Sequence, residues 1–176
     1  MIKTTLVRMT SKADLPLLSK LQDQYIDWVA SMLQSQCNIF LKPAEIDEFH
    51  DDFISDWELF SGDRGRFYLL CVEGMEAGIG GIKPISNAVA ELKRLYIVES
   101  YRGRGNGKTI LSRLIKDAED LGYQKIQLET LAFMKTAIRL YESFDFQKSA
   151  PFMGSEGKKH GIDRHEYFMN LPISQS

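Results

Sequence analysis

Residues Arg102 to Lys108 read Arg-Gly-Arg-Gly-Asn-Gly-Lys and separate an apolar run from an amphipathic helix pattern. Upstream, the leucines, isoleucine and valine of residues 92–98 predict a strand, and downstream, residues 109–115 begin a helical repeat of apolar positions. A strand, a glycine-rich turn and a helix N-terminus in this order point several backbone N–H groups outward, next to the positive end of the helix dipole. This arrangement predicts a site for a phosphorylated ligand.

The spacing of the glycines distinguishes between the known phosphate-binding motifs. A nucleotide P-loop requires G-x-x-x-x-G-K-[ST]; residues 107–109 supply its end, but Arg102 stands where its first glycine is required. The dinucleotide fingerprint G-x-G-x-x-G also fails, because Lys108 stands where its last glycine is required. The pattern that fits is R-x-x-G-x-G, formed by Arg102, Gly105 and Gly107.

This pattern, directly after the strand sequence of residues 91–98, resembles the acyl-CoA-binding motif of the GNAT superfamily of N-acetyltransferases. A second segment, residues 137–146, is similar to the A-x-x-L-Y-E-x-x-G-F signature that ends the last core helix of that superfamily. Two residues depart from the family pattern. Asp145 replaces the usual glycine, and Met134 stands where many members have an asparagine that contacts the CoA arm.

The composition bounds the kind of protein. A chain of 176 residues, 44% hydrophobic and 26% charged, is typical of a globular protein, and we expect one domain over residues 1–176. A net charge of −2 gives no global attraction to nucleic acid or anionic membrane, and we expect neither as a partner. With no long apolar run and no signal-peptide pattern, we expect a cytoplasmic location. Cys37 and Cys71 lack C-x-x-C spacing and are interpreted as reduced structural thiols, with no metal site.

Hydrophobic periodicity predicts elements in the order β-α-α-β-β-β-α-β-α-β-β. The expected strands are residues 4–9, 67–72, 77–82, 91–98, 125–129, 146–148 and 164–170, and the expected helices begin near 12, 44, 109 and 134. This is a mixed α/β (α+β) chain. The GNAT resemblance implies a strongly twisted mixed sheet of six to seven strands, splayed at the cofactor site beside the fourth strand and flanked by about four helices.

The resemblance further implies an acetyl-CoA-dependent N-acetyltransferase, in which an amine attacks the thioester directly in a ternary complex. The strand before the glycine loop would supply backbone groups to the acyl-pantetheine from Leu95, Tyr96 and Ile97, with the Ile97 N–H as donor to the thioester oxygen. The loop would wrap the pyrophosphate with Arg102, Gly103, Arg104, Gly105, Asn106, Gly107 and Lys108. The charged side chains of Arg104 and Lys108 either contact a phosphate of the ligand or are simply solvated, and the sequence leaves both alternatives open.

Two residues are the predicted catalytic pair. Tyr141 matches the tyrosine that in many relatives protonates the CoA thiolate, and an ordinary phenol pKa near 10 keeps it protonated at neutral pH; the alternative is a purely packing role. Glu91 stands where relatives often place a carboxylate that takes the amine proton, directly or through water; the alternative is a surface charge on an edge strand. Glu129 would face the same cleft and position the amine.

Weaker candidates complete the site. His50, His160 and His165 are alternative bases, but none lies in a motif. Residues 45–58 carry seven carboxylates and no lysine or arginine, and as an acidic rim they would favour a cationic amine, or else form the solvated face of a helix. Residues 152–161, rich in glycine and lysine, are either a lid on the acceptor or a hairpin connection.

Three functional classes compete. The favoured one is an N-acetyltransferase acting on a primary amine of a small molecule or protein; the alternative is a non-catalytic acyl-CoA-binding or sensing module of the same fold. A nucleotide-triphosphate enzyme is disfavoured by the missing leading glycine and by the lack of a downstream magnesium-binding motif. The sequence names neither the acceptor nor the acyl chain length. A homodimer through the C-terminal strands is compatible with the sequence but not required by it.

Overall fold

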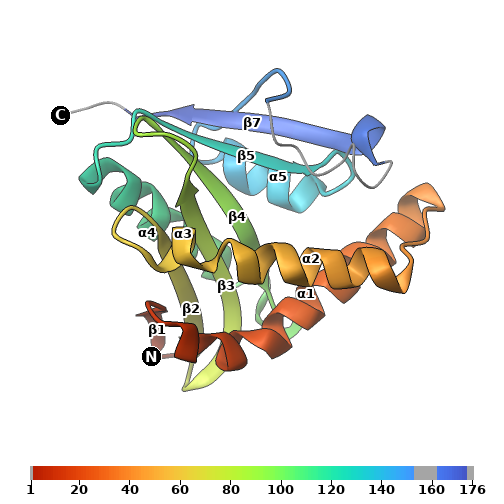
Figure 1. Cartoon of the computed structure of the whole chain (residues 1–176), viewed down its shortest axis with the longest axis horizontal. Coiled ribbons are helices and arrows are strands. Elements are labelled where there is room, and N and C mark those ends of the chain that lie inside the picture. The colour runs from red at the N-terminus through yellow and green to blue at the C-terminus, as the bar shows by residue number, and fades with distance from the viewer. Residues whose placement is uncertain (1, 153–161, 174–176) are drawn as a thin grey trace.

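A seven-stranded mixed sheet runs through the molecule in the order β1-β2-β3-β4-β5-β7-β6 (Figure 1). The computed structural model describes residues 2–152 and 162–173. The strands are β1 (Thr4–Arg8), β2 (Arg66–Val72), β3 (Met75–Pro84), β4 (Val89–Ile97), β5 (Lys125–Leu131), β6 (Gln147–Lys148) and β7 (Glu166–Pro172). The helices are α1 (Leu15–Cys37), α2 (Pro43–Ser55), α3 (Trp57–Ser61), α4 (Asn106–Asp120) and α5 (Lys135–Glu142), with short 3-10 turns at Lys12–Asp14, Glu99–Tyr101 and Asp163–His165. The predicted mixed α/β class is confirmed, and the order of elements is as predicted except for the additional helix α3 before β2.

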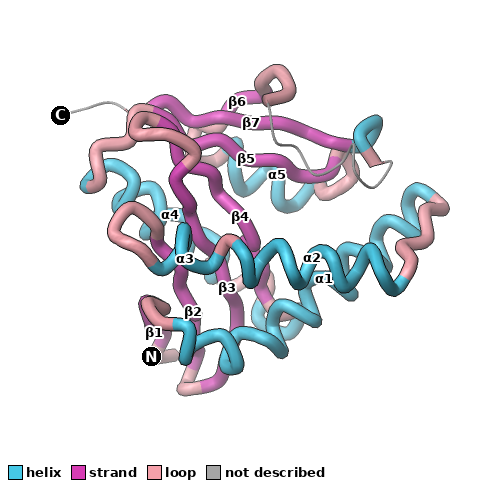
Figure 2. Tube along the Cα trace, in the orientation of Figure 1, coloured by secondary structure: helices cyan, strands magenta, loops and turns pink. Residues whose placement is uncertain are grey.

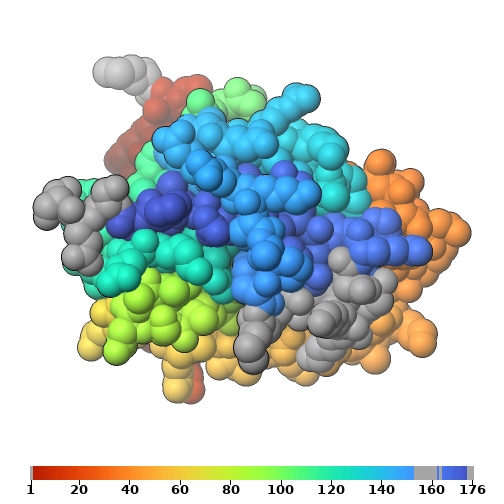
Figure 3. Space-filling view, turned by 90° about the horizontal axis from the view of Figure 1, so that it is seen from above, coloured from red at the N-terminus to blue at the C-terminus, as the bar shows by residue number. Residues whose placement is uncertain are grey.

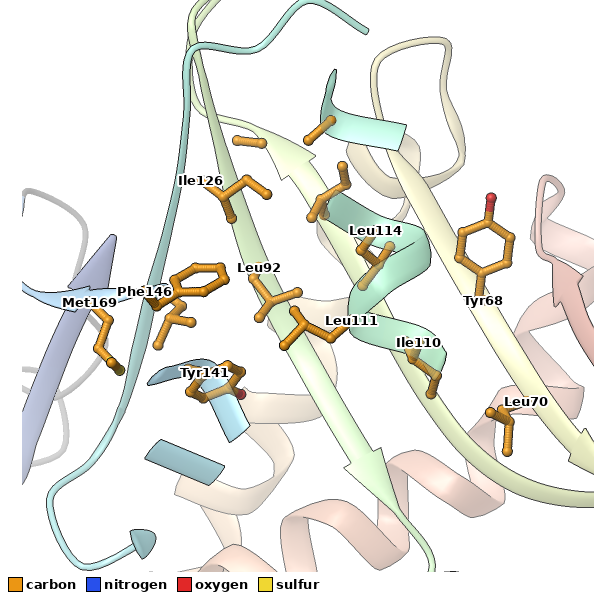
Figure 4. Packing of buried hydrophobic residues seen from close by; sticks show 14 of the residues in the cluster. Tyr68, Leu70, Leu92, Ile110, Leu111, Leu114, Ile126, Tyr141, Phe146 and Met169 are labelled. Atoms are coloured by element: carbon orange, nitrogen blue, oxygen red, sulfur yellow. The ribbon is translucent and has the colours of Figure 1, made fainter. Parts of the chain in front are cut away.

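The helices cover both faces of the sheet. α1 and α2 cross in front of β3 and β4 and pack against each other, whereas α4 packs behind β2, β3 and β4 (Figures 1 and 2). Two hydrophobic clusters therefore form, one on each face. The cluster behind the sheet joins α4 and α5 to the strands, and Figure 4 shows Leu92, Leu111, Tyr141 and Phe146 meeting there.

The pairing of the strands divides the sheet into two parts. β1 to β4 form an antiparallel meander, and β5, β7 and β6 form a second antiparallel group. These parts join through the parallel pair β4–β5, which requires the crossover helix α4. In Figure 1 the two parts diverge beyond that junction.

The cluster on the front face is rich in aromatic rings. Phe53, Trp57, Phe60 and Phe67 pack with ring centroids 5.3 to 6.0 Å apart. The helix expected to begin near residue 44 is in fact two helices, α2 and α3, which meet at Asp56. The Asp56 carboxylate pairs with Lys83 of β3. The turn lets Trp57 and Phe60 of α3 enter the cluster.

The C-terminal strands close one side of the molecule. Seen from above, the blue chain of β7 crosses the face and starts beside the orange segment that joins α1 to α2 (Figure 3). A small cluster of Leu33, Leu131 and Ile162 underlies this meeting point, with Ile39 and Leu41 packed against it. Of the described helices, none has the length and apolarity needed to cross a membrane.

Candidate functional site

The parallel strands β4 and β5 separate after four pairs. Val89 to Leu92 pair with Lys125 to Leu128, while beyond this point β5 continues to pair with β7 as far as Leu131. In the described part of the chain, the pairing of β4 with β5 therefore ends at Leu92, and Arg94 to Ile97 have no strand partner on that side. The sheet is splayed beside its fourth strand, as the GNAT resemblance implied.

A β-bulge reshapes β4 at this opening. The register with β3 shifts between Ile79 and Gly81, and Arg94 takes a left-handed conformation with φ of 60°. An extra residue of this kind re-aims the side chains that follow it. Tyr96 consequently packs into the front cluster, whereas Leu95 and Ile97 pack against the rear cluster.

The backbone of Ile97 is aimed at the opening. Val98 N–H bonds to the Ala77 carbonyl, so these two residues form a hydrogen-bonded pair. Bonded and non-bonded pairs alternate in an antiparallel ladder, and the neighbouring pair, Gly78 and Ile97, is a non-bonded one. The N–H and C=O groups of Ile97 therefore point away from β3, toward the unpaired edge of β4.

The glycine loop forms an open cradle of donors beside this edge. Gly103 and Gly105 have φ of 73° and 82°, and Gly105 is the N-cap of α4. No acceptor within residues 2–152 and 162–173 takes a hydrogen bond from the backbone N–H groups of residues 103–108. An added Cβ at Gly103 or Gly105 would meet nothing within 4 Å. Outward donors at the start of a helix of 15 residues are suited to an anion.

The charged side chains of the loop divide into two groups. Arg104 and Lys108 are exposed. Arg102 instead donates from Nε to the Ile97 carbonyl at 2.8 Å, and its guanidinium lies 4.7 Å from the Trp28 ring centre and 5.6 Å from that of Tyr96. Arg102 thus fastens the loop to the end of β4 and to α1, while Arg104 and Lys108 extend toward solvent.

A pocket of about 120 Å³ opens between β4, β5, α1, α2 and α5. Its walls are mostly apolar, with Leu92 and Leu95 from β4 and Met134 from the start of α5. Its polar and charged lining residues are Tyr25, Lys93, Arg94, Glu129, Thr130 and Tyr141. Met134, which replaces the family asparagine, takes part in this wall and lies 3.6 Å from the Thr130 hydroxyl.

Tyr141 lies where α5 meets the pocket. Its side chain is 7% exposed, and its ring centre lies 5.8 Å from that of Phe146. Figure 4 shows these two rings side by side. Burial, and secondarily the nearby phenol of Tyr25, raises the pKa of Tyr141 above the ordinary tyrosine value. The phenol is therefore protonated at neutral pH and stays protonated well into the alkaline range.

The two predicted carboxylates occupy different places. Glu129 lines the pocket. Glu91 is 4% exposed on a strand with a neighbour on each side, so the interpretation of Glu91 as an exposed edge charge is wrong. Its carboxylate lies 3.8 Å from Lys83 Nζ, and Lys83 also pairs with Asp56, so Glu91 belongs to a charged cluster outside the pocket lining.

The described histidines, His50 and His165, are not among the residues that line the pocket. His50 lies 3.6 Å from Asp23, and His165 contacts Arg164. His160 and the predicted lid, except for Phe152 at its start, lie outside the described residues. No group of three or more histidine, cysteine or acidic side chains in the described chain could hold a metal ion.

Sequence reasoning missed part of the site. Tyr25, Trp28 and Arg94 carry no motif in the sequence. Arg94 follows a lysine in an ordinary strand pattern, and only the bulge turns it into the pocket wall. A positively charged residue within an otherwise buried strand was the one available signal.

The comparisons with known proteins agree with this geometry. The model of the acetyltransferase (GNAT) family matches residues 29–146. The uncharacterized N-acetyltransferase YjgM of Escherichia coli is 30% identical over 57% of this chain and 62% of its own length. The uncharacterized N-acetyltransferase YsnE of Bacillus subtilis is 36% identical over 57% of this chain and 66% of its own length. The matches thus span just under two thirds of each relative.

Solved structures show the same fold over the full length. The PaiA N-acetyltransferase of Thermoplasma acidophilum, solved in complex with coenzyme A, superposes with a TM-score of 0.71. The superposition covers 97% of this chain and 99% of that protein, at 17% sequence identity. At this identity the likeness concerns the fold alone.

Proposed function

The chain belongs to the acetyltransferase (GNAT) family, and we propose that it transfers an acetyl group from acetyl-CoA to a primary amine of a small molecule or protein. One observation carries the proposal. The open N–H cradle of residues 103–108 follows the end of β4 in the chain, and the pocket that contains Tyr141 is lined by Leu92 to Leu95 of the same strand. A phosphate-bearing arm on the cradle would place its far end in the pocket.

The cradle and the strand edge divide the binding of acetyl-CoA between them. The N–H groups of residues 103–108 receive the pyrophosphate, and Arg104 and Lys108 supply positive charge to it or to the 3′-phosphate. The acyl-pantetheine lies along Leu95, Tyr96 and Ile97, in the place that a neighbouring strand would otherwise occupy. The outward N–H of Ile97 is the donor that stabilises the developing oxyanion of the thioester.

The reaction then requires one proton donor for the thiolate and one proton acceptor for the amine. The neutral amine attacks the thioester carbon, the C–N bond forms, and the C–S bond breaks as the tetrahedral intermediate collapses. The phenol of Tyr141 gives its proton to the departing thiolate, because burial keeps that phenol protonated. Glu91 takes the amine proton through water, since its carboxylate lies outside the lining, while Glu129 in the pocket wall positions the amine.

The test is ligand binding followed by turnover. Acetyl-CoA, CoA, ATP and NAD are compared by thermal shift, where a ligand at about 100 times its Kd adds about 2.7 kcal/mol of stability. We expect a shift with acetyl-CoA and CoA only. Release of the CoA thiol is then followed with a panel of primary amines. Binding without any release would identify a non-catalytic acyl-CoA-binding module, and a shift with ATP alone would overturn the acetyltransferase proposal.

A further inference from the structure

We propose that the amine accepted by this site carries a carboxylate, and that Arg94 binds it. The inference rests on the proposed acetyl transfer and specifies its acceptor as an amino acid or a compound like one. The carrying observation is a buried guanidinium in the pocket wall whose known contacts include no carboxylate.

Arg94 is held in place by an unusual backbone. It is 7% exposed, although arginine is almost never buried unless it is paired. Its φ of 60° marks the bulge that interrupts the pairing of β3 and β4. Bulges that re-aim one side chain are frequent next to active sites. Here the bulge turns Arg94 toward α1 and α2, at the pocket.

The contacts of Arg94 leave its charge without a counter-ion. Its Nη2 donates to the Phe49 carbonyl at 3.0 Å. Its guanidinium carbon lies 5.7 Å from the ring centre of Tyr25 and 5.8 Å from that of Phe53. Among residues 2–152 and 162–173, no aspartate or glutamate forms an ion pair with it. A guanidinium has several donors in a planar fork, and one carbonyl satisfies only part of it.

The surroundings of the guanidinium belong to the pocket. Tyr25 and Phe49 both line it, as does Arg94 itself, together with Tyr141. A buried charge that lacks a partner is costly, and an anionic ligand would supply the missing partner. The fork of arginine matches the geometry of a carboxylate, which it binds through two parallel hydrogen bonds.

The acidic helix does not reverse this conclusion. Of the residues 45–58, which predicted a cationic acceptor, only Phe49 lines the pocket. Among the described residues, the charged side chains that line the pocket are Lys93, Arg94 and Glu129. A ligand with a carboxylate for Arg94 and an amine near Glu129 and Tyr141 matches these charges better than a polycation does.

The experiment compares free amino acids with their carboxamides, which differ only in the charge of that group. Each of the common amino acids and its amide is titrated into the protein in the presence of saturating CoA, and binding is measured by calorimetry. For the amino acid that binds best, we expect the amide to bind about 10- to 100-fold more weakly, as for loss of a hydrogen-bonded charge.

Variants then assign the preference to Arg94. In Arg94→Gln the acid and the amide should bind equally, and Arg94→Lys should keep part of the preference because it keeps the charge but not the fork. The control is Arg8→Gln, because Arg8 is an exposed residue of β1 at the far edge of the sheet. This variant should keep the full preference for the acid over the amide. A structural clamp on α2 would instead make Arg94→Gln lose thermal stability and weaken the acid and the amide by the same factor, and that result would overturn the inference.

Turnover separates this inference from the proposed function. Acetylation of amines with no preference for the acid would overturn the carboxylate site and leave the acetyltransferase standing. Carboxylate binding that depends on Arg94 but leads to no CoA release would support the site and overturn the enzymatic proposal. If no amino acid binds more tightly than its carboxamide, the inference is overturned, whatever the result for turnover.

Discussion

The side-chain amide of Asn106 donates a hydrogen bond of 2.9 Å to the Tyr101 carbonyl, across the turn that contains the two left-handed glycines. The bond joins the first residue of α4 to the last residue of the 3-10 turn after β4. Asn106 is 6% exposed, so its side chain holds the loop from inside. The cradle is therefore shaped before any anion arrives, which lowers the entropy lost on binding.

Asn106→Ala should weaken the cradle more than the fold. The substitution removes the bond and leaves the Tyr101 carbonyl without that donor, at a cost of about 1–3 kcal/mol. Because the loop must then be ordered by the ligand, we expect the Kd for CoA to rise about tenfold or more. Calorimetry measures the Kd, and denaturant unfolding measures the stability. A variant that loses stability but binds CoA as the original chain does would show that the loop needs no such support.

Gly105→Asp should abolish CoA binding, since it places a carboxylate where we propose the pyrophosphate. Gly74→Asp is a matched control, because Gly74 has a φ of 79° against 82° for Gly105 and equally open surroundings, but lies in the β2–β3 turn. Both variants should lose about 1 kcal/mol from the left-handed backbone. The thermal shift produced by CoA then measures whether each variant still binds CoA. Equal CoA shifts in the two variants would remove the pyrophosphate from this loop.

The element order was predictable because each element carries its own local signal. The apolar repeats of α1 and α4 and the apolar and aromatic run of β2 need no distant contact to be recognised. The break between α2 and α3 was not predictable, since it depends on Asp56 meeting Lys83 of a strand that comes later in the chain. The bulge at Arg94 likewise exists only because β3 and β4 change register.

The site shows the same division. The loop from Gly103 to Lys108 was predicted from spacing, because the motif is local and its geometry is carried by glycine conformations. The burial of Glu91 and the pocket position of Arg94 follow from which strands are neighbours, and a single sequence does not contain that information directly. The functional roles of Tyr141, Glu91 and the loop residues stay predictions that the variants described here would test.

Asp145→Gly should stabilise the protein slightly. Asp145 has a φ of 65°, at the position where the family signature has glycine. The backbone therefore keeps the left-handed conformation, which is strained for a residue with a Cβ. Removing Cβ should gain up to about 1 kcal/mol, and Asp145→Ala should lose stability because alanine is less tolerant of this region. Unfolding midpoints of the three proteins measure the order. A less stable glycine variant would mean that the aspartate side chain contributes more than its conformation costs.

Glu91→Gln and Glu129→Gln should have distinguishable kinetics. Neutralising the proposed proton acceptor, Glu91, should lower kcat on the order of 100-fold. It should also reduce stability, because the charge of Lys83 is then left to Asp56 and the remaining contacts. Glu129→Gln should chiefly raise KM for the amine, because Glu129 lines the pocket. Steady-state kinetics separate the two roles, and the opposite pattern would assign the proton acceptor to Glu129.

Tyr141→Phe should lower kcat on the order of 100-fold, with little change in the Kd for acetyl-CoA, because only the proton donor is lost. The raised pKa gives a second test. Below the unfolded-state value near 10 the phenol is neutral in both states, and stability does not depend on its titration. As pH rises above 10 the unfolded chain ionises first, so stability falls until the folded-state pKa is passed.

Phenylalanine at position 141 removes this contribution to the alkaline loss. Tyr68, Tyr96 and Tyr123 also have raised pKa values and remain in the variant, so the loss should become smaller without vanishing. Denaturant unfolding between pH 9 and about 12 compares the slopes of the two proteins. Parallel slopes would show that Tyr141 does not titrate abnormally, and an unchanged kcat at neutral pH would take the phenol out of the mechanism. If Tyr141→Phe changes both the alkaline slope of stability and kcat at neutral pH, then Tyr141 is buried, protonated and acting on the thiolate.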